Sequence, residues 1–139
     1  MLNALGRAFL GRLGPLQPLG PRVSELLLVG YTGGFAVAAA VGGARSTCAV
    51  DLAPKAVAAC RRNEALNGLA AGEHFVADVW DFLRASRRMV DIVVLDPPSM
   101  APSARARGKA LKAYEELNMG ALRLVRPGGT CRIWQGIGI

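Results

Sequence analysis

The sequence is poor in the residues that build metal sites, disulfide frameworks and membrane spans. Its 139 residues include three cysteines and one histidine. Cys48, Cys60 and Cys131 form no Cys-x-x-Cys pair, which argues against both a zinc site and a disulfide framework. The longest apolar runs, such as Leu26 to Val29, have the length of a strand and are far too short to cross a bilayer. We therefore expect a soluble, cytoplasmic protein with no metal and no membrane partner.

Acidic residues are also scarce, with 10 Asp and Glu against 17 Lys and Arg and a net charge of +7. Such a charge attracts a polyanion such as RNA, without indicating which sequence is read. Residues 1–22 contain no acid and are rich in Gly, Pro and Leu, which predicts a loose basic N-terminal arm before one domain over 23–139. The alternative for this arm is an organelle transit peptide, although the segment lacks serine.

From Glu25 onward, strand-length apolar runs alternate with segments of helical spacing. This alternation is typical of an α/β fold, a doubly wound Rossmann-like parallel sheet with strand order 3-2-1-4-5. We expect strands at 26–30, 46–50, 73–77, 91–95 and 130–134. We expect helices from the glycine turn to Gly42, at about 54–67, at 79–87 and at 109–125, with a turn at 126–129. Ligands bind such sheets beyond the carboxyl ends of the strands.

The turn after the first strand, Tyr31-Thr32-Gly33-Gly34-Phe35, has glycines that let the backbone approach a ligand closely and it opens a helix. A turn that needs glycine only for packing is the alternative. The spacing is not Gly-x-Gly-x-x-Gly, so a nicotinamide-dependent oxidoreductase is a weaker hypothesis.

Three carboxylates stand where successive strands end. Asp51 closes the second strand, where it can accept hydrogen bonds from the ribose hydroxyls of a nucleoside cofactor. Asp78 closes the third strand and can accept from an adenine amino group. Either residue can instead cap the helix that follows. In Asp96-Pro97-Pro98-Ser99, two prolines fix an extended backbone that can hold a base edge beside a methyl donor, unless they only stiffen the loop.

The chain resembles the 23S ribosomal RNA cytosine-C5 methyltransferase family, in which the motifs YTGGF, VDLAPKA, RRNEALNGL, DPPS and RPGG occur in this order. The resemblance implies a class I methyltransferase core, S-adenosylmethionine as the cofactor and ribosomal RNA as the substrate. It places residues 31–35, Tyr31, Thr32, Gly33, Gly34 and Phe35, around the methionine part. It also places Asp51 and Leu52 at the ribose and Asp78 and Val79 at the adenine. Asp96 would bind at the cofactor and, with Pro97 and Pro98, face the substrate base as the catalytic group.

The chain departs from that family at several positions. Leu27 replaces a polar residue, and Met100 replaces a phenylalanine. The family's nucleophilic cysteine corresponds to a position near Gln135, and Cys131 lies four residues earlier, about 13 Å along a strand. We therefore interpret Cys131 as a buried structural residue. The family also has an N-terminal RNA-binding domain and further C-terminal strands, so we expect a truncated catalytic domain.

Two other functions remain open. An exocyclic amino nitrogen can attack a methyl donor directly, so an amino-group methyltransferase with the same DPP loop needs no cysteine. The second open function is that of a catalytically inactive fragment that only binds the cofactor. Cationic residues after the loop either meet substrate phosphates or form a solvated face: Arg105, Arg107, Lys109 and Lys112. Tyr114 and Asn118 share one helix face, with Tyr114 expected in the core together with Trp80 and Phe82.

Overall fold

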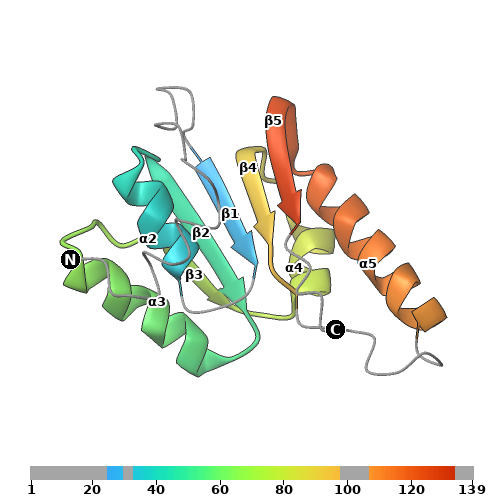
Figure 1. The fold of residues 1–139 in the computed structure, drawn as a ribbon, viewed down its shortest axis with the longest axis horizontal. Helices are drawn as coiled ribbons and strands as arrows, with labels where there is room; N and C mark the ends of the chain where they lie inside the picture. The colour runs from blue at the N-terminus through green and yellow to red at the C-terminus, as the bar shows by residue number, and fades with distance from the viewer. Residues whose placement is uncertain (1–24, 30–32, 98–106, 134–139) are drawn as a thin grey trace.

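The computed structural model describes residues 25–29, 33–97 and 107–133. The arm expected over residues 1–22 lies outside these ranges. Strands and helices alternate along the described chain (Figure 1), which confirms the α/β class. The elements are β1 (Glu25–Val29), α2 (Gly34–Val41), β2 (Ser46–Asp51), α3 (Pro54–Leu66), β3 (Glu73–Val76), α4 (Val79–Ala85), β4 (Val90–Leu95), α5 (Arg107–Leu122) and β5 (Val125–Ile133).

The five strands form one sheet in the order β3-β2-β1-β4-β5, and each neighbouring pair is parallel. Two parallel neighbours must be joined by a crossover, and here helices supply the described crossovers. The order reverses direction at β1, which lies between β2 and β4. In such sheets a crevice opens at that reversal, at the carboxyl ends of the strands.

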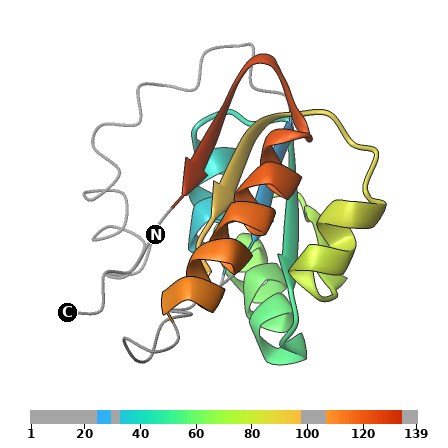
Figure 2. The same ribbon diagram turned by 90° about the vertical axis from the view of Figure 1, so that its right-hand side faces the viewer.

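Helices cover both faces of the sheet (Figure 2). Successive residues of β2 pack on opposite faces. Cys48 and Val50 of β2 pack with Leu83 of α4 and Leu117 of α5 in one buried cluster. Ala49, between them in sequence, packs with Phe35 of α2 on the other face. This period of two is what a strand buried on both faces requires.

Local sequence sets where several helices begin and end. Pro54 occupies the first turn of α3, where its missing N–H costs nothing. Gly42 ends α2, and its N–H donates to the Ala38 carbonyl oxygen. Asp78 caps α4, with its Oδ1 accepting from the Asp81 N–H at 3.1 Å. The helix boundaries expected from the sequence therefore hold to within a few residues.

The final strand differs from the expectation. The helix α5 ends at Leu122, and β5 already begins at Val125, so residues 126–129 are not the turn that precedes the strand. Val90 pairs with Val125 while Ile92 pairs with Thr130, which makes these residues a bulge within β5. Gly128 has a φ of 83°, and a Cβ on Gly129 would lie 2.5 Å from the Asp91 carbonyl oxygen. Arg126 Nη1 also binds Asp91 Oδ1 at 3.0 Å, which ties the bulge to β4.

Within the described ranges, none of the helices has the length and apolar character needed to cross a membrane. The same ranges hold no cluster of three or more His, Cys, Asp or Glu side chains that suits a metal ion.

Candidate functional site

Asp51 and Asp96 lie at the same level on either side of β1. In the sheet register, Val29 pairs with Val50 of β2 and with Leu95 of β4. Asp51 and Asp96 are the next residues after Val50 and Leu95. Neighbouring strands are about 4.8 Å apart, so two strand spacings, about 10 Å, separate the two backbones. The sheet itself therefore brings these carboxylates to the two flanks of the point where the glycine turn leaves β1.

Gly33 begins α2 in a left-handed conformation, with a φ of 78° and a ψ of 10°. Only glycine adopts this conformation routinely. Its carbonyl oxygen accepts from the Val37 N–H at 3.0 Å, which closes the first helical turn. A Cβ placed on Gly34 would have no atom of the described residues within 4 Å, so these residues leave the space beside the start of α2 open.

The Asp51 side chain is used partly within its own loop. Its Oδ1 accepts from the Ala53 N–H at 2.7 Å, and its carbonyl oxygen accepts from the Ala77 N–H at 3.1 Å. The alternative that Asp51 caps α3 is wrong, because the capping position belongs to Ala53, which has no side-chain hydrogen bond. The bond from the Ala53 N–H therefore fixes the carboxylate within the loop between β2 and α3. The next side chain, Leu52, is 69% exposed at the same rim.

Asp78 and Val79 follow β3 at the same edge of the sheet. The capping bond to Asp81 confirms the structural role considered for Asp78 and fixes the direction of its carboxylate. Val79 is half-buried and packs against the cluster beneath α4. Ala77, the residue directly before Asp78, donates its N–H to the carbonyl oxygen of Asp51. This bond links the ends of β2 and β3.

Asp96 and the buried Pro97 continue β4 beyond Leu95. Asp96 is half-buried, and this burial raises the pKa of its carboxyl above the usual range. A carboxylate kept partly out of water interacts more strongly with a polar group brought beside it. Asp96 therefore has the environment expected of a residue that meets a ligand.

Phe35 behaves differently from the other predicted residues. Phe35 is the second residue of α2, and its side chain is buried against Ala49, Cys60 and Val94. It therefore anchors the start of α2 in the core. Tyr31, Thr32 and Pro98 lie outside the described residues. The structure thus brings Gly33, Gly34, Asp51, Leu52, Asp78, Asp96 and Pro97 to one rim, with Phe35 and Val79 packed beneath it.

Sequence reasoning missed Cys60, which lies on α3 directly against the glycine turn. A Cβ on Gly33 would lie 2.7 Å from both the Cα and the Sγ of Cys60. Burial, followed by the charges of Glu64 and Asp51, raises the pKa of the Cys60 thiol to about 11. The sequence carries no signal for this contact, because it joins two helices that face each other only in the folded chain.

Cys131 lies well below the rim. It pairs with Val93, three residues before Asp96, and packs against the cluster under α4 and α5. At a rise of ~3.3 Å per residue, this places it about 10 Å from the level of Asp96. Burial raises the pKa of its thiol, which keeps it protonated at neutral pH. Both features agree with a structural role for Cys131, but its side chain is half-buried rather than fully buried as expected.

Cationic side chains gather at the start of α5. In Figure 1 the strand arrows point to the lower edge of the sheet, and α5 begins near that same edge. The helix α5 therefore begins near the rim. Arg107, Lys109 and Lys112 are all exposed there, and none forms an ion pair with another described residue. By contrast, Arg84, Arg88 and Arg126 are each paired with an acid.

Comparison with known proteins agrees with this geometry. The chain is 38% identical over 104 residues to the Ribosomal RNA large subunit methyltransferase I of Klebsiella pneumoniae (strain 342), and 42% identical over 104 residues to the protein of that name from Aeromonas hydrophila. Each match covers 71% of this chain and 26% of the relative, so the chain spans about a quarter of the length of these relatives.

A solved structure has the same fold. The crystal structure of the methyltransferase SMU.776 complexed with SAH matches with a TM-score of 0.66 and 31% identity, over 79% of this chain and 31% of that chain. The family described as S-adenosylmethionine-dependent methyltransferase matches residues 4–133. The chain therefore belongs to the S-adenosylmethionine-dependent methyltransferase family.

Proposed function

We propose that this chain binds S-adenosylmethionine at the rim formed by Gly33, Asp51, Asp78 and Asp96 and transfers its methyl group to ribosomal RNA. The observation that carries the proposal is the shared level of Asp51 and Asp96 on either side of β1. That arrangement matches a ligand with a polar nucleoside end and a reactive centre a few ångströms away. Such a substrate would place the enzyme in the cytoplasm.

The residues of the rim fit the chemical parts of the cofactor. The start of a helix carries a partial positive charge, so the first turn of α2 suits the carboxylate of the methionine part. The open space beside Gly34 leaves room for that approach. In this proposal Asp51 accepts hydrogen bonds from ribose hydroxyls, with the exposed Leu52 beside it, and Asp78 and Val79 border the adenine. When bound, the cofactor supplies an electrophilic methyl group.

Asp96 and Pro97 would orient the substrate base. A methyl transfer needs the attacking atom, the methyl carbon and the sulfur in line, and rigid groups near the donor provide that orientation. The half-buried Asp96 can accept a hydrogen bond from a base amino group in a partly dehydrated site. Pro97, together with the neighbouring Pro98 in sequence, would keep that acceptor in place.

The RNA would approach from the α5 side of the rim. The exposed cations Arg107, Lys109 and Lys112 lie there, whereas the α4 side presents Asp78, with Asp81 paired to Arg84. Phosphates are attracted to the first group and repelled by the second. The relatives named above are ribosomal RNA methyltransferases, and their substrate class agrees with this charge distribution.

The family resemblance proposes C5 of cytosine as the methylated atom. A second target, an exocyclic amino nitrogen, is favoured by the position of Cys131, because C5 methylation needs a thiolate that adds to C6 and Cys131 pairs with Val93, three residues before Asp96. Mass spectrometry of nucleosides from treated ribosomal RNA separates the two. A 5-methylcytidine product supports the first target, and an N-methylated nucleoside rejects it.

Calorimetric titration with S-adenosylmethionine tests the core of the proposal. Wild type should bind, and Asp51→Ala should lose about 2 kcal/mol of binding free energy, the cost of a charge-assisted hydrogen bond. A folded wild-type chain that shows no binding would refute the cofactor site. Binding without methyl transfer to ribosomal RNA would instead indicate the inactive cofactor-binding fragment.

A further inference from the structure

The backbone of Gly33 rests directly on the side chain of Cys60. The positions available to a Cβ on Gly33 lie 2.7 Å from the Cys60 Sγ and 2.9 Å from its Cβ, far closer than two carbon atoms approach. Cys60 is 1% exposed and belongs to the cluster that includes Phe35 and Ala49. The side chain at position 60 therefore lies directly against the backbone of Gly33.

The same side chain also lies near Asp51. The Asp51 charge is one of the causes that raise the pKa of the Cys60 thiol, after burial and Glu64. Cys60 thus touches one element of the rim and lies within electrostatic range of another. With its pKa raised to about 11, the thiol stays neutral at physiological pH and acts through its size rather than through a charge.

We propose that Cys60 is a positioning residue for the cofactor, because its volume sets the height of the Gly33 backbone relative to Asp51. This inference rests on the proposed function, since it requires that the methionine part of S-adenosylmethionine lie against the glycine turn. A larger side chain at position 60 would push Gly33 toward the ligand. Gly33 cannot relax freely, because its left-handed conformation and its bond to Val37 fix the turn.

The chain offers a matched control in Cys48. Cys48 is also 1% exposed, but it faces the cluster beneath α4 and α5, on the opposite side of the sheet from Gly33. Cys60→Leu and Cys48→Leu add the same volume to equally buried positions. Overpacking destabilises both variants, but only Cys60→Leu should alter the glycine turn.

The experiment measures the affinity of the full chain for two ligands by calorimetry, S-adenosylmethionine and adenosine. Cys60→Leu should weaken S-adenosylmethionine binding about tenfold, or roughly 1.4 kcal/mol of binding free energy, because it displaces Gly33, with a smaller effect on adenosine, which lacks the methionine part. Cys48→Leu should leave both affinities unchanged. The near-isosteric Cys60→Ser should bind S-adenosylmethionine as tightly as wild type.

The outcomes separate this inference from the proposed function. If wild type fails to bind S-adenosylmethionine, the proposed function fails. If wild type binds and Cys60→Leu binds equally well, the positioning role is refuted. Equal losses for Cys60→Leu and Cys48→Leu, or equal losses for both ligands, would also refute it, since they indicate a general disturbance of the core. Should Cys60→Leu not fold, the smaller Cys60→Val and Cys48→Val pair makes the same comparison.

Discussion

The Nε2 atom of His74 lies 3.1 Å from Oε2 of Glu64, and both side chains are only 2% exposed. The geometry between them is not that of a hydrogen bond, so the two side chains are in buried contact without one. The same Glu64 oxygen accepts from the Gly72 N–H at 3.1 Å. This contact joins α3 to the segment that leads into β3, at the end of the sheet opposite the proposed site.

Glu64→Ala should therefore destabilise the fold severely. It removes the acceptor of the Gly72 N–H and leaves His74 without its buried partner, which together cost about 3 kcal/mol. Urea unfolding followed by circular dichroism measures the change. The exposed Glu116→Ala on α5 is the control, with an expected change below about 0.5 kcal/mol. Similar values for the two variants would show that the buried contact contributes nothing.

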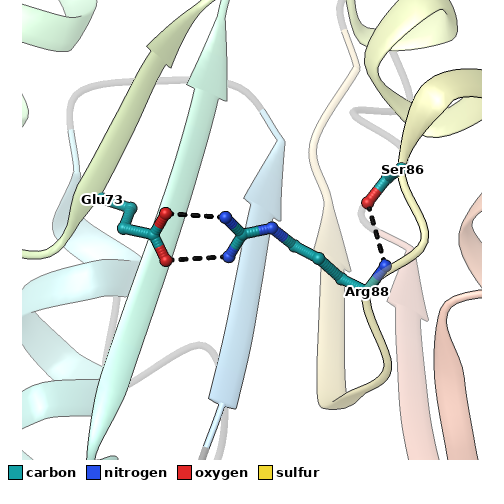
Figure 3. A network of polar contacts seen from close by, with 3 residues as sticks. All are labelled: Glu73, Ser86 and Arg88. Atoms are coloured by element: carbon teal, nitrogen blue, oxygen red, sulfur yellow. Dashed lines mark hydrogen bonds and ion pairs between the residues drawn. The ribbon is translucent and has the colours of Figure 1, made fainter.

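Arg88→Ala should have a smaller effect that depends on pH. Both Arg88 Nη atoms bind the Glu73 carboxylate, at 2.8 and 2.6 Å (Figure 3), and its guanidinium lies 5.6 Å from the centre of the Phe75 ring. Because Glu73 is half-exposed, the loss at neutral pH should be about 1 kcal/mol.

The sign of the pH dependence follows from the pKa of Glu73. The hydrogen bond from Arg88 lowers that pKa, so the pair stabilises the fold above the usual carboxyl range and the stabilisation is lost as pH falls through the lowered value. Urea unfolding at neutral and acid pH should show the Arg88→Ala and wild-type stabilities converging in acid. A gap that stays constant would mean that the packing on Phe75, rather than the ion pair, carries the effect.

Asp96→Asn should stabilise the protein while removing its activity. Burial raises the pKa of Asp96, so ionising this carboxyl in the folded chain costs free energy that the amide does not incur. The stability contributed by the neutral form is present below the unfolded pKa, about 3.9, and is lost as pH rises through the raised value. The melting temperature of Asp96→Asn should thus equal that of wild type in acid and exceed it at neutral pH. A variant less stable than wild type at neutral pH would contradict this.

Removing the cations at the start of α5 should weaken RNA binding and its dependence on salt. For the triple variant R107Q/K109Q/K112Q, the slope of log affinity against log salt concentration should become shallower by about 2, as expected for three lost contacts to single-stranded phosphates. Fluorescence anisotropy with a ribosomal RNA fragment gives this slope. The control R45Q/R61Q/R62Q removes the same charge from exposed positions just before β2 and on α3. If both variants change the slope equally, only net charge matters.

Much of the site could be predicted because its residues directly follow recognisable strands. Asp51 and Asp96 each come after a run of buried apolar residues, so the end of the run also locates the carboxylate. The capping role of Asp78 was one of two alternatives and is confirmed, while the same role for Asp51 is wrong. Pro54 explains the difference, since a proline in the first helical turn assigns the capping position to Ala53.

Other features depend on contacts that no local pattern reports. Residues 126–129 have the composition of a turn, yet the pairing of Val125 with Val90 extends the strand past them and converts the turn into a bulge. The contacts of Cys60 with Gly33, and of Glu64 with His74, join elements brought together only by the order of strands in the sheet. The burial of Cys60 and the residue that it faces both come from the structure alone.

The level shared by Asp51 and Asp96 makes this fold tolerant of change in some places and intolerant in others. Their separation is set by the hydrogen-bond ladders that join β1 to β2 and to β4, and not by the loops that carry them onward. Loops at the rim can gain or lose residues without moving the two carboxylates apart. One residue inserted within β2 or β4 would instead turn the following carboxylate to the opposite face of the sheet. Evolution or engineering of a new substrate preference on this scaffold is therefore expected to vary the loops and leave the strand lengths alone.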